Sequence, residues 1–520
     1  MSRVTSSSDA LPTGTFHLNS PYGRRAVALS IAAAVGGFLF GFDSSVVNGA
    51  VESIQSDFAL NDFVTGFIVA IALLGCALGA LIAGNLADRW GRLRVMFLGA
   101  IMFFVSAIGT GLAFSVWDLG LWRVVGGIGI GIASVVAPAY IAEVAPRQIR
   151  GSLASLQQLA ITIGIFAALL SDALLEGIAG GADNVLWWGL EAWRWMFLVG
   201  VVPAAVYGIL SFTVPESPRF LISQGRSDEA RAVFARLVPA VDLDKTINEL
   251  TLAIETDKKN AGVSIRGKAL GLQPIVWIGI ILSVFQQFVG INVIFYYSTS
   301  LWNSVGMTNA PLISVITSVT NVLVTLIAIF LVDRVGRKPI LLTGSVLMAL
   351  SLGTMALAFS FATGTGKDVH LDGAWGPIAL VAANLFVIGF GASWGPLVWV
   401  LLGEIFPSRI RGKALGVAAG AQWIANFLIT MTFIPAVAAL LKAPAPASAV
   451  QRLELQPQDC LGTPHRGGMD SVFLVPDSQR GPQPRRIRRK SCWRIRRRTR
   501  QSLSAVFPSS LDIFMYTLRQ

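Results

Sequence analysis

Gly84-Asn85-Leu86-Ala87-Asp88-Arg89-Trp90-Gly91-Arg92 is repeated later in the chain as Ile329-Phe330-Leu331-Val332-Asp333-Arg334-Val335-Gly336-Arg337. Each copy lies between two long apolar segments. After two further apolar segments, each copy is followed by a second related stretch, Glu143–Gly151 in the first half and Glu404–Gly412 in the second. The repetition predicts two equivalent membrane bundles with their charges gathered on one face, which is how alternating-access transporters are built.

The composition is that of a membrane protein. Of the 520 residues, 54% are hydrophobic and 13% are charged, whereas about 25% of the residues in a soluble domain are charged. Residues 269–332 contain no Asp, Glu, Lys or Arg, and this length can hold two transmembrane helices of about 20 residues each. A large soluble core is the alternative, but it does not need several apolar segments longer than about 18 residues.

Eleven apolar segments are long enough to cross a bilayer. They lie near residues 26–49, 63–86, 95–114, 119–142, 153–171, 195–214, 271–300, 311–332, 339–362, 374–403 and 414–441. We therefore expect an all-α membrane protein of two six-helix bundles, with about eleven recognisable transmembrane helices and the twelfth missing.

This fold divides the chain into five parts. They are a cytoplasmic N-terminal segment at 1–25, an N-terminal six-helix bundle at 26–214, a cytoplasmic loop with short amphipathic helices at 215–268, a C-terminal bundle with five recognisable helices at 269–441, and an atypical basic tail at 442–520.

The loop charges indicate the orientation. Arg and Lys are concentrated in the loops at 87–94, 143–152, 333–338 and 404–413, whereas the alternate loops carry acidic residues with little basic charge. The positive-inside rule therefore places the N-terminus and the basic loops in the cytoplasm of a multi-pass protein of the cell membrane.

The tail differs in composition from the rest of the chain. Residues 443–520 contain fourteen Lys and Arg against five Asp and Glu, and so supply nine of the twelve net positive charges. Either the tail binds lipid headgroups or nucleic acid, or it results from a shifted reading frame or a wrongly assigned chain end. We favour the second explanation, because the missing helix and the odd composition begin together. The total charge is no reason to expect a nucleic-acid partner.

Asp43 and Arg123 are charged residues inside two of the predicted spans. A charge within the membrane is costly, and it is a candidate for function for that reason. Both residues lie in the outer half of their spans and can face each other. A carboxylate beside a guanidinium stays ionised, and a buried carboxyl that loses this partner takes up a proton. The pair predicts a proton-coupling device, and a static ion pair that locks two helices is the alternative.

Neutral polar side chains inside the spans are the second feature with a chemical meaning. The amides among them are Gln157, Gln158, Gln286, Gln287, Asn292, Asn321, Gln422 and Asn426. Amides both donate and accept hydrogen bonds, which suits neutral hydroxyl groups, and the indole faces of Trp394 and Trp399 suit the C–H face of a sugar ring. For any single amide, interhelical hydrogen bonding is the alternative. The sequence contains no metal-ligand cluster and no nucleophile–base set, so we expect no enzyme, no metal and no cofactor.

These residues resemble the sugar porter family of the major facilitator superfamily and, within it, bacterial proton-linked glucose permeases. The paired Asp-Arg-x-Gly-Arg loops match this family, as do Pro215-Glu216-Ser217-Pro218-Arg219 and Gln286-Gln287-Phe288-Val289-Gly290-Ile291-Asn292. The resemblance covers about residues 24–441 and implies the major facilitator fold. The chain departs from the family in lacking a twelfth helix and the Pro-Glu-Thr-Lys-Gly-type motif that follows it.

The resemblance implies three groups of functional residues. The sugar would be bound by Gln158, Gln286, Gln287, Asn292, Asn321, Trp399 and Gln422, with Phe40 and Tyr296 lining the cavity. Asp43 and Arg123 would be the proton pair. A cytoplasmic latch would consist of Asp88, Arg89, Arg92, Glu143, Arg150, Asp333, Arg334, Arg337, Glu404 and Arg411.

We therefore expect a monomeric transporter that imports a monosaccharide, most simply glucose or another hexose, by proton-coupled symport. Its partners would be the sugar, the proton and the lipid bilayer, without nucleic acid. A passive sugar facilitator is one alternative, and a non-transporting sugar sensor or an inactive truncated product is another. The sequence does not choose among glucose, galactose, xylose and inositol, which differ by single hydroxyl groups.

Overall fold

The computed structural model describes residues 20–146, 150–260, 264–267, 270–304, 307, 309–362, 371, 373–407 and 410–442. Within these residues, eleven helical segments are long and apolar enough to cross a membrane. The predicted all-α membrane fold is confirmed. The predicted tail at 442–520 lies outside the described residues except for Lys442.

The first half of the chain forms six of these spans. Its elements are α1 (Pro21–Val46), η1 (Val47–Gly49), α2 (Val51–Asp57), α3 (Asp62–Trp90), α4 (Arg92–Gly111), α5 (Val116–Val144), α6 (Arg150–Ala179), α7 (Ala192–Val199) and α8 (Val201–Thr213), with a small hairpin of β1 (Val185–Trp187) and β2 (Leu190–Glu191) between α6 and α7. The helix α1 begins at Ser20, whose hydroxyl accepts a hydrogen bond from Gly23 N at 3.0 Å, and Pro21 occupies the first helical position, where its missing N–H costs nothing.

The second half contributes the other five spans, and two of them are interrupted. Its elements are α12 (Pro274–Phe288), α13 (Ile291–Ser304), α14 (Ala310–Val335), α15 (Arg337–Ser360), α16 (Trp375–Ala392), α17 (Trp394–Ile405) and α18 (Arg411–Lys442). One span is broken at Gly290, which has φ +87°, and another at Ser393. Interrupted helices expose backbone groups at membrane depth, and in transporters they are found beside the substrate.

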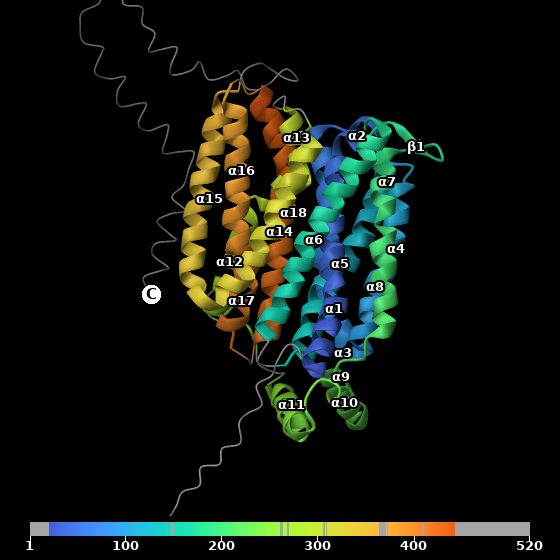
Figure 1. Cartoon of the computed structure of the whole chain (residues 1–520), viewed down its shortest axis with the longest axis vertical. Helices are drawn as coiled ribbons and strands as arrows, with labels where there is room; N and C mark the ends of the chain where they lie inside the picture. The colour runs from blue at the N-terminus through green and yellow to red at the C-terminus, as the bar shows by residue number, and fades with distance from the viewer. Residues whose placement is uncertain are drawn as a thin grey trace, which may run out of the picture. The chain divides into compact units, whose positions relative to one another are not determined.

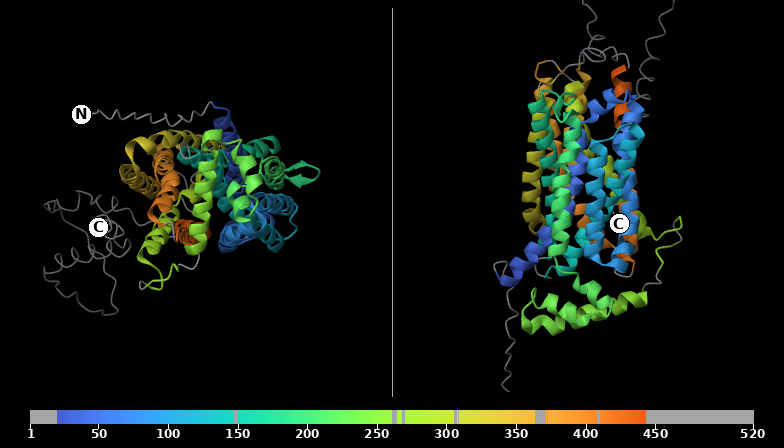
Figure 2. Two further views of the ribbon diagram at one scale, coloured as in Figure 1. Left: turned by 90° about the horizontal axis from the view of Figure 1, so that it is seen from below. Right: turned by 90° about the vertical axis from the view of Figure 1, so that its right-hand side faces the viewer.

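Three helices lie between the halves: α9 (Pro218–Ser223), α10 (Ser227–Phe234) and the longer α11 (Ala240–Asn260). They lie together at the end of the bundle where α1 begins (Figure 1 and Figure 2, right). Ala230 and Phe234 are the buried residues of α10, as expected for an amphipathic helix on a surface.

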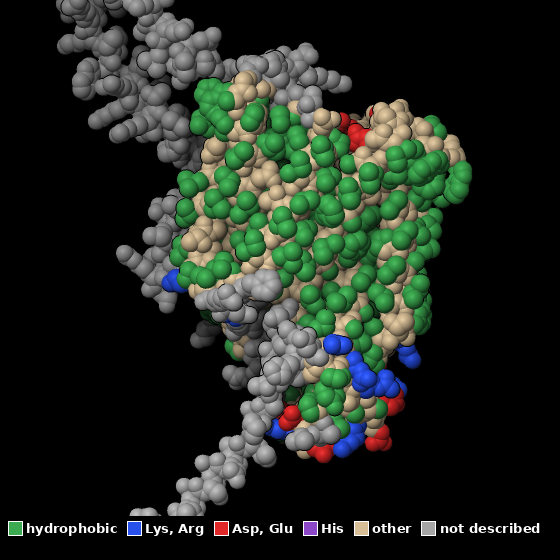
Figure 3. Space-filling model, in the orientation of Figure 1, with side chains coloured by type: hydrophobic (Ala, Val, Ile, Leu, Met, Phe, Trp, Pro, Cys, Tyr) green, Lys and Arg blue, Asp and Glu red, His purple; other side chains and the backbone are tan. Residues whose placement is uncertain are grey.

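Charged side chains gather at the ends of the helical bundle. Apolar side chains cover its side, and Lys, Arg, Asp and Glu gather over the end with α9–α11 (Figure 3). We call this the basic end; it includes Arg89, Arg92 and Arg219. The opposite end, where α2 and the β1–β2 hairpin lie (Figure 1), carries Glu52 and Asp57 and is called the acidic end.

The two halves pack against each other through α3 with α18 and α6 with α14. Glycine allows the closest approach: Gly66 of α3 lies against the carbonyl of Met431 in α18, where a Cβ would collide with the oxygen. Close backbone approach through small residues is the usual way membrane helices associate. The boundary between the halves is therefore packed along these two helix pairs, and the functional side chains lie close to it.

Candidate functional site

Asp43 and Arg123 form a buried ion pair in the first half. Nη1 of Arg123 donates to Oδ1 of Asp43 at 3.1 Å and to the backbone carbonyl of Asp43 at 3.4 Å. Asp43 is 8% exposed and Arg123 is 4% exposed. Asp43 lies near the end of α1 and Arg123 lies two turns into α5, so the antiparallel course of these helices brings the two residues to the same depth. The structure thus brings together the two residues that the sequence suggested as a pair.

The second half also reaches this pair. A small cavity is bounded by Phe40, Asp43, Ser44, Val69, Leu73, Cys76, Arg123, Ile130 and Tyr296. Its volume is about 10 Å³, enough for about one water molecule. Tyr296 belongs to α13, whereas the other residues belong to α1, α3 and α5. Movement of the second half relative to the first would therefore change the surroundings of Asp43.

Arg123 has further contacts that hold it in place. Its guanidinium lies 5.7 Å from the centre of the Phe197 ring, a distance suited to a cation–π interaction. Nε of Arg123 has no hydrogen-bond partner among the described residues. Loss of the Asp43 carboxylate would leave a buried cation without a partner of opposite charge in this part of the structure.

The amides of α12 are buried and only partly satisfied. Nε2 of Gln286 donates to the carbonyl of Trp394 at 2.9 Å, which the break at Ser393 brings to the start of α17. Gln287 accepts a hydrogen bond from the side chain of Asn292 across the break at Gly290. Oε1 of Gln286 has no partner among the described residues, and the same holds for Oε1 of Gln422. These oxygens can accept hydrogen bonds from a ligand.

The other residues predicted to bind sugar differ in how deeply they are buried and in what they contact. Gln158 is half-buried in α6, and Asn321 and Tyr296 are buried in α14 and α13. Phe40 packs edge-on against Trp423 of α18, with ring centres 5.1 Å apart. Trp399, the predicted stacking residue, is 40% exposed on α17, whereas Trp394 is buried and donates through Nε1 to Ser345 at 2.8 Å.

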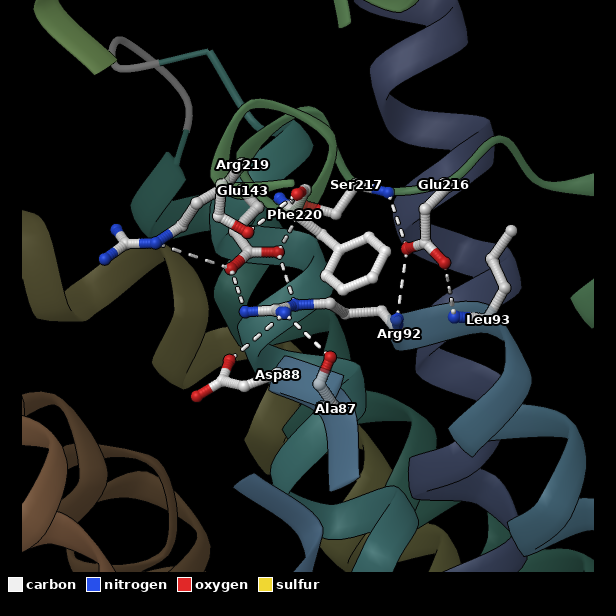
Figure 4. Close-up of polar contacts among 10 residues, drawn as sticks. Ala87, Asp88, Arg92, Leu93, Glu143, Glu216, Ser217, Arg219 and Phe220 are labelled. Carbon is white, nitrogen blue, oxygen red and sulfur yellow. Dashed lines mark hydrogen bonds and ion pairs between the residues drawn. The ribbon is translucent and has the colours of Figure 1, made fainter. Parts of the chain in front are cut away.

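At the basic end, Arg92 and Glu143 form the centre of a polar cluster (Figure 4). Nε and Nη2 of Arg92 donate to the two oxygens of Glu143 at 3.1 and 3.0 Å. Nη1 of Arg92 donates to the carbonyl of Ala87 at 2.9 Å and lies 3.2 Å from Asp88. Glu143 also accepts from the Ser217 hydroxyl at 2.5 Å. This bidentate geometry fixes the ends of α3, α4 and α5 together.

Glu216 is a residue of this cluster that the sequence analysis did not select. Its carboxylate accepts hydrogen bonds from the backbone N–H groups of Arg92 at 3.0 Å and Leu93 at 3.4 Å, the first two residues of α4 (Figure 4). Ser217, also not selected, donates to Glu143. The motif Pro215–Arg219 was quoted only for its family resemblance, although a Glu and a Ser before a Pro could have suggested capping.

The remaining latch residues are described in part. Arg89 is exposed and Arg337 is half-buried. The side chains of Arg150, Asp333, Arg334, Glu404 and Arg411 lie outside the described part of the structure. The latch of the second half therefore stays a prediction.

At the acidic end, Asn48 of η1 links the two halves. Its Nδ2 donates to the Ser298 hydroxyl at 2.9 Å, and its Oδ1 accepts from Thr299 N at 3.0 Å. The Ser298 and Ser314 hydroxyls lie 2.5 Å apart. We call Asn48, Ser298, Thr299 and Ser314 the acidic-end gate. None of these four residues stands out in the sequence, because a single Asn or Ser at the end of a span carries no periodic signal.

Comparison with known proteins gives an independent result. The protein-family model described as "Sugar (and other) transporter" matches residues 29–447. A glucose transport protein of Synechocystis sp. is 53% identical over 410 residues, which cover 78% of this chain and 87% of the relative. The D-xylose-proton symporter of Escherichia coli (strain K12) is 37% identical over 435 residues, covering 78% of this chain and 84% of that protein.

Solved structures agree with this result. The major facilitator proton:xylose symporter XylE bound to 6-bromo-6-deoxy-D-glucose matches with a TM-score of 0.69 and 35% identity, over 81% of this chain and 90% of that chain. The partially occluded inward-open xylose transporter XylE from E. coli matches with a TM-score of 0.66 and 32% identity, over 79% and 92% of the respective chains. The resemblance found in the sequence is thereby confirmed, and the chain is a multi-pass membrane protein that belongs to the sugar transporter family of the major facilitator superfamily.

Proposed function

We propose that this protein imports a hexose, most simply glucose, by proton-coupled symport across the cell membrane, with its N-terminus in the cytoplasm. The observation that carries the proposal is the buried Asp43–Arg123 pair, which lies beside a cavity shared with Tyr296 of the second half. The names of two relatives, a glucose transport protein and a D-xylose-proton symporter, support a sugar and a proton as the two substrates.

The pair would couple the proton to a movement of the helices. With Arg123 at 3.1 Å, the carboxylate of Asp43 is compensated. When α1 and α5 separate, a buried and unpaired carboxylate would cost several kcal/mol. Proton uptake by Asp43 removes the cost of the unpaired carboxylate, so separation of the pair favours protonation of Asp43. A step that also requires bound sugar would then move both substrates in the same direction.

The buried amides would bind the sugar. A hexose presents hydroxyl groups that both donate and accept, and the open Oε1 atoms of Gln286 and Gln422 accept without demanding a charge. The two side chains come from α12 and α18, which pack against each other. The neutral character of these groups favours a sugar over an ionic substrate. We further propose that Gln158, Gln287, Asn292, Asn321, Trp399, Phe40 and Tyr296 contribute to the same site.

Alternating access requires gates at both ends. In this structure the acidic end is bridged by Asn48, which joins η1 to α13. Among the described side chains, the basic-end bonds of Arg92 and Glu143 stay within the first half. The structure is therefore consistent with a state that is closed at the acidic end. From this state the sugar would leave the protein through the basic end.

The experiment is sugar transport by the purified protein in proteoliposomes. We expect accumulation of labelled glucose when the outside is more acidic than the inside, and loss of accumulation when a protonophore discharges the gradient. Asp43→Asn should abolish accumulation while exchange of labelled for unlabelled sugar continues, because Asn is permanently neutral. Asp183→Asn, an exposed acid in a loop, serves as the control. Wild-type protein that equilibrates sugar without concentrating it would instead be a facilitator, and binding without flux would indicate a sensor.

A further inference from the structure

Asp172 is a second buried carboxyl in the first half, and the mechanism above does not use it. It lies in the part of α6 near the acidic end and is 3% exposed. Neither carboxyl oxygen has a hydrogen bond among the described residues. The backbone N–H of Gly49 is the polar group that faces the carboxyl. A buried carboxylate with no partner is among the most costly groups in a folded protein.

The described surroundings of Asp172 contain acidic groups and no cation paired with it. The charged group that faces it is Glu176, one turn further along α6, and Glu176 is in turn near Glu52 of α2 and Asp183 of the following loop. Among the residues that the structure describes, no Lys or Arg of the elements packed against α6 (α1, η1, α5, α7, α14, α17 and β1) forms an ion pair with Asp172. Burial beside acidic neighbours disfavours a negative charge on Asp172.

The position of Asp172 connects it to the acidic-end gate. Its Cβ and Cγ pack against Gly49, as does the sulfur of Met196 from α7. Gly49 directly follows Asn48, and both belong to η1. Asn48 makes the two hydrogen bonds to Ser298 and Thr299 that join the halves. Gly49 is therefore the one residue of η1 between the Asp172 carboxyl and Asn48, whose side chain makes the hydrogen bonds of the acidic-end gate.

We propose that Asp172 is a gating carboxyl that binds one proton each time the acidic end closes and returns it to the same side when that end opens. This inference rests on the proposed transport function. When the halves part, η1 loses its contacts with α13 and water can reach Asp172, so the carboxylate can form. Closure removes this water, and Asp172 must then take one proton from the solution at the acidic end. Because the proton returns to the side from which it came, it does not count in the proton-to-sugar ratio.

The proposal assigns different tasks to the two buried acids. Asp43 has an arginine partner whose distance can change, and it carries the transported proton. Asp172 has no such partner and senses whether the gate is closed. Removing Asp172 should therefore change the pH dependence of exchange without changing the coupling ratio.

The test is equilibrium exchange of labelled glucose in proteoliposomes, with the same pH on both sides. The Asp43→Asn variant removes the coupling proton, so its remaining pH dependence belongs to other groups. We expect its exchange rate to fall about tenfold per pH unit at alkaline pH, as required when one proton must bind before closure. Adding Asp172→Asn, which mimics the neutral carboxyl, should reduce this change to less than about twofold over the same range. Asp228→Asn, which changes an exposed acid of α10 at the basic end, should keep the full pH dependence in the Asp43→Asn background.

A second measurement separates gating from coupling. Asp172→Asn in the otherwise wild-type chain should accumulate sugar with the wild-type proton-to-sugar ratio. An unchanged pH profile on addition of Asp172→Asn to Asp43→Asn would overturn the gating role, as would a changed ratio in the single variant. If the wild type exchanges sugar but never concentrates it, the symport proposal fails, whereas the exchange experiment still tests Asp172. Asp172→Glu, which keeps a titratable group, should retain the pH dependence and so distinguishes proton binding from a packing defect.

Discussion

The carboxylate of Glu216 caps a helix that begins 124 residues earlier in the chain, by accepting a hydrogen bond from the backbone N–H of Arg92 at 3.0 Å. The helix α4 has no side-chain cap of its own, because the residue before it is Gly91. A carboxylate at this position satisfies free N–H groups and is stabilised by the helix dipole. Glu216 thereby ties the chain that leaves α8 to the loop of the repeated Asp-Arg-x-Gly-Arg motif.

Replacing this cap should lower stability measurably. Glu216→Ala removes the acceptor for the N–H groups of Arg92 and Leu93, and we expect it to reduce the free energy of unfolding by about 1 kcal/mol. The measurement is thermal unfolding of the purified protein in detergent. Glu229→Ala, which removes an exposed acid paired with Arg226 in α10, should shift the unfolding temperature much less. Equal shifts for the two variants would show that the cap contributes nothing.

The two copies of the motif allow a matched test at glycine. Gly91 has φ +91° and Gly336 has φ +89°, so alanine is strained at either position. A Cβ at Gly91 would collide with the carboxylate of Glu216, whereas a Cβ at Gly336 meets no described atom within 4 Å. Gly91→Ala should therefore lower the unfolding temperature more than Gly336→Ala. In the Glu216→Ala background the excess cost of Gly91→Ala should become smaller, and only the closer contact with the Phe220 ring should remain.

The ion pair of Arg92 and Glu143 should behave as a buried pair. Both side chains are about one-tenth exposed, and removing one partner of such a pair typically costs about 3–5 kcal/mol. We expect Arg92→Met and Glu143→Met each to lower stability strongly. The double variant should be less destabilised than the sum of the two, because each single variant leaves one buried charge without its main partner and the double variant removes both charges. A double-mutant cycle on thermal unfolding measures this coupling, and strict additivity would argue against the pair.

The acidic-end gate can be tested by access to a thiol. Asn48→Ala removes two hydrogen bonds between the halves, each worth about 0.5–1.5 kcal/mol, and so shifts the equilibrium toward the open acidic end by roughly 5- to 150-fold. The probe is Thr299→Cys in a chain whose three native cysteines are replaced by Ser, and the readout is its rate of alkylation. Asn303→Ala removes only a weaker contact to Glu52 at 3.4 Å and should leave the rate nearly unchanged. No acceleration by Asn48→Ala would refute the gate.

The fold could be predicted from the sequence because the membrane imposes a simple rule. Apolar length identifies each span, and the repeated Asp88 and Asp333 loops reveal the duplication. The interruptions were not predicted: the segments at 271–300 and 374–403 were expected as single spans, yet helices end beside Gly290 and Ser393. Hydropathy measures how apolar a segment is and contains no information on where its backbone changes direction.

The candidate site could be predicted only where a residue was costly in its local context. Asp43, Arg123 and the buried amides are polar residues in apolar segments. The cost of placing a polar group in a membrane span identified them as candidates. Asn48 and Ser298 lie 250 positions apart and act through one hydrogen bond, and Glu216 acts on a backbone 124 positions away. Such contacts depend on the packing of distant elements. The predicted span at 153–171 ended before Asp172, whereas α6 continues to Ala179, so the sequence did not reveal that this acid is buried in a helix.

The amide oxygens of the second half lead to the last prediction. Gln422→Ala removes a buried acceptor that has no partner among the described residues, so the sugar-free protein should lose little stability. Sugar binding should weaken by about tenfold, which corresponds to roughly 1.4 kcal/mol for one hydrogen bond. The Kd is measured by tryptophan fluorescence or calorimetry. Asn184→Ala is the control, since Asn184 lies in an exposed loop, where its Nδ2 donates to the carbonyl of Ala179. A set of monodeoxy glucoses then identifies the hydroxyl group that Gln422 binds. The wild type and Gln422→Ala should bind the sugar without that hydroxyl with equal affinity. If Gln422 only joins helices, every monodeoxy glucose should show the same difference between the two proteins.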